Sequence, residues 1–274
     1  MSVQPRPADA EFAALTEKIS RERGFGCASY KEKCLRRRIA VRMRARGVHT
    51  YRDYATVLDR DAREYELLLD ALTINVTKLF RNWETFSAIA GDVIPALWPE
   101  NGEHIRCWSA GCASGEEPYS LAILMHREAA QRRDEKALPR IMILGTDIDR
   151  ESLKAAERGT FGEDAFADTP PAIRRRYFSP KPPHSLDPGV KAMVRFERRD
   201  LLHEPSPSGG LDLITCRNVI IYFDRASQEM LFQRFFDALA PGGFLVLGKV
   251  ETLLGPARNL FVPVNPRERI FRKP

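Results

Sequence analysis

The chain has 274 residues, of which 43% are hydrophobic and 29% charged, and its 43 Lys/Arg against 37 Asp/Glu give a formal net charge of +6. These proportions are ordinary for a globular protein. No apolar run approaches the ~20 residues that a membrane-spanning helix needs, and the N-terminal residues lack the apolar core of a signal peptide. Length and composition therefore predict a cytoplasmic protein with one large domain or two modest ones.

Cysteine and histidine usage argues against a disulfide framework and against a bound metal. The cysteines are odd in number and none form a C-x-x-C pair: Cys27, Cys34, Cys107, Cys112 and Cys216. The five histidines are scattered and form no H-x-x-x-H pattern. Paired ligands at short spacing are the usual sequence signature of a structural zinc site. We therefore expect a reduced protein without metal.

Apolar residues recur at helical spacing throughout the first quarter of the chain, where no β-like alternation occurs. The expected helices cover residues 11–23, 31–46, 51–58 and 62–72. Residues 1–75 contain 15 Lys/Arg and 11 Asp/Glu, so this segment carries +4 of the net charge of +6. We predict a small helical domain over residues 1–75 whose basic surface favours an acidic partner.

The expected helix at residues 31–46 is the most basic part of the chain. Leu35, Ile39 and Met43 are four residues apart and form a stripe that would pack against the rest of the domain. Cations flank this stripe more densely than solubility requires. A solvated face, a receptor-binding surface and a nucleic-acid surface all stay open at this point. Four of the flanking arginines are expected to be exposed, so that they can be changed without opening the core, and they are the candidates for docking a substrate: Arg37, Arg38, Arg42 and Arg44.

Residues 105–125 have the pattern of a strand, a tight turn and a helix. The apolar run ends in small residues, and Gly111 and Gly115 allow the chain to turn sharply. The N-terminus of the following helix would offer unpaired N–H groups to an anionic group. The spacing is G-x-x-x-G, which is neither the dinucleotide G-x-G-x-x-G nor a P-loop. An ordinary strand-to-helix turn therefore remains an alternative.

Three further apolar runs, at residues 141–145, 211–216 and 244–247, complete an α/β pattern. Asp147 follows the first of them, at the position where nucleoside-binding α/β folds hold ribose hydroxyls. It lies 36 residues after Gly111, further than the roughly 20 of the dehydrogenase pattern. A surface loop acid is the alternative. The order of strand, glycine turn, helix, strand and acid is that of an S-adenosylmethionine methyltransferase, in which Asp147 would accept hydrogen bonds from ribose.

Four motifs in the right order resemble the CheR family, the chemotaxis protein-glutamate methyltransferases. They are N-V-T-K-L-F-R at 75–81, W-S-A-G-C-A-S-G-E-E-P-Y-S at 108–120, T-D-I-D at 146–149 and C-R-N-V-I-I-Y-F at 216–223. The resemblance extends over nearly the whole chain. It implies an α/β, Rossmann-like methyltransferase domain at residues 76–274, preceded by the helical domain. It also implies a small β-subdomain inserted at about 160–197, a stretch that is short and proline-rich here.

The same resemblance implies which residues form the site. Arg81 and Tyr222 would orient the reacting carboxylate, and Arg81 is also a candidate for holding the cofactor. Glu116 would accept from the cofactor's ammonium group, with Glu117 as the alternative, and Ala110 and Gly111 would contact its amino-acid end. Asp200 stands where the family has Asn, and Lys249-Val250 replace the usual His-Ser. The remaining cofactor-binding candidates are Asn75, Thr77, Asp147, Asp200, Leu201, Arg217 and Asn218.

The implied reaction is methyl transfer from S-adenosylmethionine to glutamate carboxylates of methyl-accepting chemotaxis receptors, by a monomer that binds no nucleic acid. An exposed glutamate has a pKa near 4.3 and is already ionised at pH 7. No base is required; the enzyme must hold the carboxylate ~3–3.5 Å from the methyl carbon and remove its water. The alternatives are a nucleic-acid methyltransferase, with Cys216 near its site, and a non-catalytic module that binds the cofactor.

Overall fold

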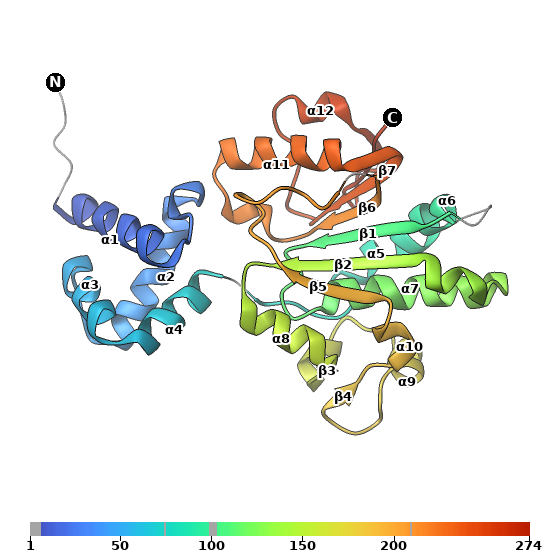
Figure 1. The fold of residues 1–274 in the computed structure, drawn as a ribbon, viewed down its shortest axis with the longest axis horizontal. Coiled ribbons are helices and arrows are strands. Elements are labelled where there is room, and N and C mark those ends of the chain that lie inside the picture. Colours follow the sequence, from blue (N-terminus) through green and yellow to red (C-terminus); the bar gives the residue numbers. More distant parts are fainter. Residues whose placement is uncertain (1–6, 74, 99–102, 209) are drawn as a thin grey trace. The chain divides into compact units, whose positions relative to one another are not determined.

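The computed structural model describes residues 7–73, 75–98, 103–208 and 210–274 (Figure 1). The chain divides into two compact units. Unit 1 comprises the residues up to 74 together with Tyr222–Ser227, and unit 2 comprises residues 75–221 and 228–274. Among the described residues, no helix has the length and the apolar character to cross a membrane.

Unit 1 is helical, as the apolar spacing predicts. Its elements are α1 (Pro7–Arg23), a 3-10 turn (Cys27–Ser29), α2 (Glu32–Ala45), α3 (Tyr51–Arg60) and α4 (Ala62–Leu72). The Thr50 side chain accepts a hydrogen bond from the Asp53 N–H and so caps α3, and Asp61 caps α4 in the same way. The predicted stripe of Leu35, Ile39 and Met43 is buried in the core of this unit.

The short segment Tyr222–Ser227 packs with unit 1 although most of its sequence neighbours belong to unit 2. The Lys31 N–H donates to the Tyr222 carbonyl at 2.9 Å, and the Asp224 N–H donates to the Ser29 carbonyl at 2.9 Å. The Arg38 guanidinium carbon lies 4.6 Å from the centroid of the Tyr222 ring. The residue expected to act in catalysis is therefore held by the arginine-rich helix α2.

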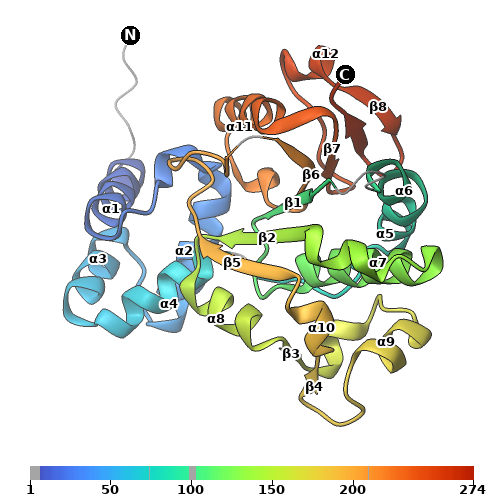
Figure 2. The ribbon, with the colours of Figure 1, turned by 45° about the vertical axis from the view of Figure 1, so that its right-hand side comes forward.

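Unit 2 is built on a seven-stranded sheet with the order β5-β2-β1-β6-β7-β9-β8. The first five are parallel to one another, and β9 and β8 form an antiparallel hairpin at the edge beside β7 (Figure 2). The strands are β1 (Ile105–Ala110), β2 (Ile141–Asp147), β5 (Val194–Arg198), β6 (Leu211–Cys216), β7 (Leu239–Leu247), β8 (Val262–Asn265) and β9 (Ile270–Arg272).

The strand order indicates which edge of the sheet binds a ligand. From β1 the chain proceeds to β2 on one side and later to β6 on the other, so the strand order reverses beside β1. In open α/β sheets, ligands bind at the carboxyl ends of the strands at such a reversal. Ala110, Asp147 and Arg217, which end or directly follow β1, β2 and β6, are thereby brought to one edge.

Helices α7 (Glu116–Arg132) and α8 (Arg150–Arg158) connect the first strands, and α11 (Arg225–Ala238) connects β6 to β7. The main core of unit 2 lies on the α7 side of the sheet. There α5 (Trp83–Ala88), a π-turn (Ile89–Val93) and α6 (Ile94–Leu97) also pack, through Phe86, Ile89, Val93 and Ile94. On the opposite face, α11 packs through Phe235, whose ring is 5.5 Å from that of Trp108.

The proline-rich stretch between β2 and β5 contains little β-structure. Its strands β3 (Thr160–Phe161) and β4 (His184–Ser185) have two residues each and pair antiparallel. The rest of it consists of a 3-10 turn (Glu163–Phe166), α9 (Pro171–Tyr177) and α10 (Pro188–Lys191). Buried His184 contacts Glu163 and Arg174 at its Nε2 and so ties β4 to the residues after β3.

Candidate cofactor site in unit 2

The turn after β1 needs glycine for two separate reasons. Gly111 has φ +80°, and a Cβ built on it would lie 2.5 Å from Cγ2 of Val219. Any other residue would therefore be strained and would push away the loop that follows β6. The N–H groups of Gly111 and Cys112 donate to the Thr146 carbonyl at 2.8 and 2.9 Å, which fixes the turn to the end of β2.

Asp147 is the buried acid at the end of β2. One carboxylate oxygen accepts from the Ala113 N–H at 2.8 Å and the other from the Asp149 N–H at 3.0 Å. Burial raises the pKa of this carboxyl, although the backbone hydrogen bonds oppose the shift. Among the described residues no Lys, Arg or His forms an ion pair with Asp147. A buried carboxylate without a cationic partner favours a ligand that donates hydrogen bonds or carries positive charge.

Glu116, the first residue of α7, is a second buried carboxylate beside the same turn. Both of its oxygens are within 3.0 Å of the Ser114 hydroxyl, and no cation pairs with it in the described part of the chain. Burial raises its pKa as well. Burial raises the pKa of the Cys112 thiol, and the charges of Asp147, Glu117 and Glu116 add to the shift. Both acids therefore lie around the turn at residues 111–115.

Glu117, by contrast, is hydrogen-bonded to side chains of the sheet and so has a structural role. Its Oε1 accepts hydrogen bonds from the hydroxyls of Ser109 on β1 at 2.8 Å and Thr215 on β6 at 2.6 Å. Its Oε2 lies 3.7 Å from the Arg217 guanidinium. Glu117 thus joins two neighbouring strands to α7, and its carboxylate is already occupied. Of the two acids considered for the cofactor's ammonium group, Glu116 is the one left with acceptor capacity.

Arg217 is buried and holds the segment that contains Arg81. Its Nη2 donates to the Arg81 carbonyl at 2.7 Å and lies 3.2 Å from Oδ1 of Asn82. Burial lowers the pKa of the guanidinium, and its Nε has no hydrogen-bond partner among the described residues. Arg81 itself is half-buried and donates to the Val76 carbonyl at 2.9 Å. Arg217 therefore holds residues 81 and 82, at the end of the segment at residues 75–82, in place.

Glu251 organises the loop that follows β6. Its buried carboxylate accepts from the N–H groups of Gly248 at 2.6 Å, Asn218 at 3.0 Å and Val219 at 3.0 Å. Asn218 has φ +62°, a left-handed conformation that is uncommon outside glycine. The Asn218 Oδ1 atom is buried and has no partner among the described residues. Glu251 thus holds the loop in the conformation that presents Asn218.

Asp200 and Leu201 follow β5 at the same edge of the sheet. The Asp200 carboxylate accepts from the Leu202 N–H at 2.9 Å and lies 2.9 Å from Nδ1 of His203. The carbonyls of Leu201 and Leu202 accept from Arg234 of α11 at 3.2 and 3.0 Å. This turn is therefore fixed from two sides.

Comparison with known proteins connects this arrangement to one family. Residues 75–269 match the model for the CheR methyltransferase SAM binding domain, and residues 10–73 match that for the CheR methyltransferase all-alpha domain. The chain belongs to the CheR methyltransferase family.

Three relatives illustrate the extent of the likeness. The chain is 34% identical to the chemotaxis protein methyltransferase of Listeria innocua, over 91% of this chain and 92% of that one. It is 31% identical to the chemotaxis protein methyltransferase of Klebsiella aerogenes, over 93% and 87%. It is also 31% identical to chemotaxis protein methyltransferase 2 of Pseudomonas aeruginosa, over 89% and 87%. The predicted family and the predicted α/β methyltransferase fold with an N-terminal helical domain are confirmed.

The residues at the carboxyl ends of the strands fit S-adenosylmethionine, the ligand of the matched family domain. That molecule carries an ammonium and a sulfonium group, and its ribose has two hydroxyl donors. Asp147 and Glu116 are buried acids with unused acceptor capacity and no cationic partner in the described structure. The unpartnered Oδ1 of Asn218 adds a third acceptor. The donor set of the ligand therefore complements the acceptor set of the chain.

The other cofactor-binding candidates have the following surroundings. Asn75 donates through Nδ2 to Asp149, whose carboxylate also caps α8. Thr77 is half-buried within the segment at 75–82. Ala110 is fully buried at the end of β1. Among the described residues, no three His, Cys, Asp or Glu side chains gather where they could hold a metal ion.

The arginine-rich helix differs from its prediction at two of four positions. Arg38 is only 6% exposed and donates to the Leu72 carbonyl, and Arg42 forms two hydrogen bonds, of 3.0 and 2.6 Å, with buried Glu64. The expectation that both are exposed and can be changed without opening the core is wrong, because Arg42 pairs with a buried acid of α4 and Arg38 is packed over the Tyr222 ring and bonded to the last residue of α4. Arg37 and Arg44 are exposed as predicted.

The sequence did not predict two features of the site. One is the buried Glu251, which organises the loop after β6, and the other is the role of Glu117 in joining β1 to β6. The signal for Glu251 was available: the chain departs from the family's G-H-S-E at Lys249 and Val250 but keeps the glutamate. Val250 is 73% exposed, and Lys249 lies 3.3 Å from Glu84 and 3.6 Å from Glu268. Val250 therefore faces outward and half-buried Lys249 lies beside two acids, while the retained Glu251 faces the backbone.

Proposed function

We propose that this protein transfers a methyl group from S-adenosylmethionine to glutamate side chains of methyl-accepting chemotaxis receptors and forms methyl esters. Membership in the CheR family over both domains carries the proposal. The names of the relatives place them in chemotaxis. The buried acids Asp147 and Glu116, which pair with no cation in the described part of the chain, support the choice of cofactor. The reaction needs no metal, because the acceptor is already an anion at neutral pH.

When bound, S-adenosylmethionine supplies a methyl group activated by its sulfonium charge. Asp147 would accept from the ribose hydroxyls and Glu116 from the ammonium group. The backbone of Ala110 and Gly111 would contact the amino-acid end, and Asp200 and Leu201 would border the adenine. Asn75, Thr77, Arg81, Arg217 and Asn218 would complete the enclosure, with Arg217 supporting Arg81 from below through the 2.7 Å hydrogen bond to its carbonyl.

The remaining task of the chain is to orient the glutamate carboxylate and to exclude water from it, because hydration weakens an anionic nucleophile. We assign this task to the guanidinium of Arg81 and the hydroxyl of Tyr222. Tyr222 is packed over Arg38 of α2 within unit 1. The helix whose exposed Arg37 and Arg44 would meet the acidic receptor helices thus also positions the tyrosine that would act on the acceptor.

The test is transfer of tritiated methyl groups to membranes that contain chemoreceptors, followed by alkaline treatment. A methyl ester releases volatile methanol in base, whereas methyl groups on nitrogen or on nucleic acid stay bound. We expect base-labile label on the receptor and none on tRNA or duplex DNA. Treatment with a chelator should not change the rate. Base-stable label, or label on nucleic acid alone, would contradict the proposal.

A further inference from the structure

The two faces of the sheet in unit 2 are covered unequally. Side chains of β1, β2 and β5 alternate between the faces, and those of Cys107, Ile143 and Val194 are buried on the α7 side. On the opposite side, Met142 of β2 is 50% exposed although β2 has a strand on either side, β5 and β1. Figure 1 shows this face of β1, β2 and β5 without a helix in front of it. Parallel sheets are ordinarily covered on both faces, so this exposure requires a cause.

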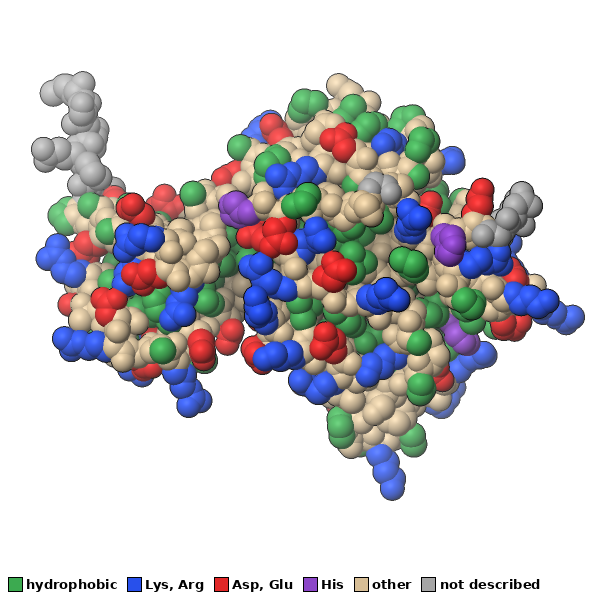
Figure 3. All heavy atoms as spheres, viewed as in Figure 1, with side chains coloured by type: hydrophobic (Ala, Val, Ile, Leu, Met, Phe, Trp, Pro, Cys, Tyr) green, Lys and Arg blue, Asp and Glu red, His purple; other side chains and the backbone are tan. Residues whose placement is uncertain are grey.

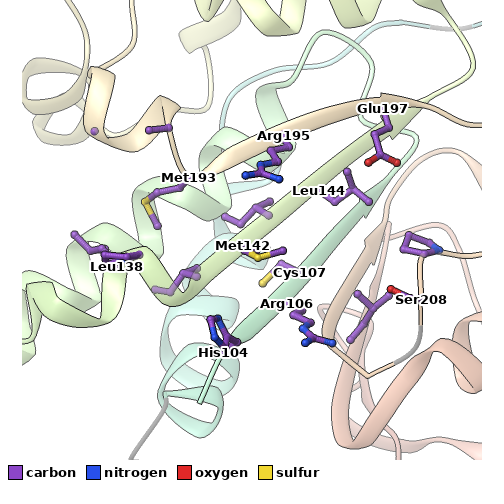
Figure 4. A pocket seen from close by; sticks show the side chains of 17 residues that line it. His104, Arg106, Cys107, Leu138, Met142, Leu144, Met193, Arg195, Glu197 and Ser208 are labelled. Atoms are coloured by element: carbon purple, nitrogen blue, oxygen red, sulfur yellow. The ribbon is translucent and has the colours of Figure 1, made fainter. Parts of the chain in front are cut away.

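The cause is the connection from β5 back to β6. This crossover passes over two intervening strands, β2 and β1, and in an α/β fold it is ordinarily a helix that covers the sheet. Here residues 199–210 make the connection, and their described part contains no helix. The face that a crossover helix would cover is therefore left as a trough, bordered by Leu138 and Met193 at one end and Ser208 at the other (Figure 4).

The trough has a volume of about 730 Å³ and an apolar floor with cationic sides. Met142 and Leu144 of β2 lie in its middle, between Arg195 of β5 and Arg106 of β1 (Figure 4). On this face of the molecule, hydrophobic groups are interspersed with Lys and Arg and with several Asp and Glu (Figure 3). An apolar strip flanked by two guanidinium groups is complementary to a partner that is apolar in the middle and acidic on its sides.

The charges that face the trough leave both arginines available. Arg106 and Arg195 form no ion pair with any described residue. The acid beside Arg106 is Asp212, which accepts from the Arg106 N–H at 2.8 Å and reduces the local positive charge without pairing with the guanidinium. Glu197 at the upper end is paired with Arg199 at 3.2 Å. Exposed His104 lies at the opposite end.

We propose that this trough binds an acidic amphipathic α-helix of a partner protein, which takes the place of the missing crossover helix. Three strands spaced ~4.8 Å apart offer a face about 10 Å wide, close to the diameter of an α-helix. The apolar side of the helix would cover Met142 and Leu144. Its Asp or Glu side chains would meet Arg106 and Arg195. The surface is on a face of the sheet and involves none of the residues assigned to cofactor or acceptor.

The experiment places a photoreactive benzoylphenylalanine at position 142 of the full-length protein in its native host. After irradiation, mass spectrometry identifies the cross-linked segment. We expect an amphipathic helix with an excess of Asp and Glu from a different protein. A synthetic peptide of that segment should bind the purified protein. Its affinity should fall about tenfold or more when Arg106→Glu and Arg195→Glu are combined, because charge reversal replaces two attractions by repulsions.

Two controls keep the result interpretable. The same photoreactive residue at Val262 of β8, which is 52% exposed, should not give this adduct. The milder pair Arg106→Gln and Arg195→Gln should weaken peptide binding while the affinity for S-adenosylmethionine is unchanged, which shows that the variants fold. Adducts only with a second copy of this chain, only with a neutral or basic segment, or no adduct at all would each overturn the proposal.

Discussion

Both units bury carboxylates, and the buried Glu64 of unit 1 differs from the buried Asp147 and Glu116 of unit 2 in having a cation beside it. Glu64 in unit 1 is 2% exposed and is met by Arg42, by the Tyr54 hydroxyl at 2.7 Å and by the more distant Arg46. Burial alone would raise its pKa, yet the hydrogen bonds from Arg42 and Tyr54 bring the pKa below its ordinary value. No described cation pairs with Asp147 or Glu116 in unit 2, and burial raises the pKa of both.

We infer from this difference that Glu64 stabilises the fold, whereas Asp147 and Glu116 bind a ligand. A buried charge costs free energy unless it is paired. Glu64 is paired within its own unit, and its interactions are complete without any other molecule. Asp147 and Glu116 leave part of that cost uncompensated, at the strand ends where an α/β sheet binds its ligands. The same chemical group therefore has a structural role in one unit and a proposed binding role in the other.

The largest expected effect follows from breaking the pair in unit 1. Arg42→Ala leaves Glu64 buried without its main partner, so the free energy of unfolding should fall by about 3 kcal/mol. Chemical denaturation followed by circular dichroism measures this. The stabilisation from Glu64 is present above its unfolded pKa near 4.5 and is lost as pH falls through its lowered folded pKa. The destabilisation by Arg42→Ala should therefore shrink at low pH.

The matched control uses the exposed arginines of the same helix. Arg37→Glu combined with Arg44→Glu should change the free energy of unfolding by no more than about 0.5 kcal/mol. It should nevertheless reduce methylation of the receptor, because the charges that would face acidic receptor helices are reversed. If Arg42→Ala is as stable as this control, Glu64 does not depend on the pair.

The second prediction tests the ligand role of Asp147. Asp147→Asn should weaken binding of S-adenosylmethionine about 100-fold, since charge-assisted hydrogen bonds to the ligand are lost. The cofactor-free protein should change in stability by no more than about 1 kcal/mol, because the loss of one backbone hydrogen bond is offset by removal of a buried charge. Calorimetry and denaturation measure the two quantities, with exposed Asp164→Asn as the control. Unchanged affinity would remove Asp147 from the site.

The sequence predicts most of the fold because apolar spacing depends on local geometry. The helix at 62–72 and the strand at 211–216 both follow from it. The position of Asp147 at the strand ends also follows, because parallel strands align their carboxyl ends. Arg38 and Arg42 could not be assigned in this way. Whether an arginine is buried depends on a partner such as Glu64, which is 22 residues further along the chain and has no signal at the arginine's own position.

The third prediction concerns Glu251, which is buried like Asp147 but whose carboxylate accepts hydrogen bonds from several backbone N–H groups. Glu251→Gln keeps one acceptor oxygen and loses the other, so the loop at 217–221 should lose hydrogen bonds and about 1–2 kcal/mol of stability. Turnover should fall with it, because Arg217 and Asn218 are in that loop. Exposed Glu84→Gln, which contacts Lys249 of the neighbouring loop, is the control. Wild-type turnover and stability in Glu251→Gln would show that the N–H groups find other partners.

The smallest effect is expected at Glu116, where the raised pKa determines the direction in which stability and cofactor affinity change with pH. Burial places the folded pKa above the ordinary value of 4.5, so the folded protein binds more protons than the unfolded one between these two values. The stability of the cofactor-free protein therefore falls as pH rises through this window. Cofactor affinity changes in the opposite direction, because the ionised carboxylate is the form that would accept from the ammonium group.

Glu116→Gln removes this titration. Above the raised pKa it should bind S-adenosylmethionine about tenfold more weakly than the wild type, as expected when one charged hydrogen-bond acceptor becomes neutral. The cofactor-free variant should be at least as stable as the wild type there. Both differences should diminish as pH falls toward 4.5, where the wild-type carboxyl is protonated too. Calorimetric titrations at several pH values test this, with exposed Glu135→Gln as the control. Equal loss of affinity at every pH would mean that Glu116 acts by shape and not by charge.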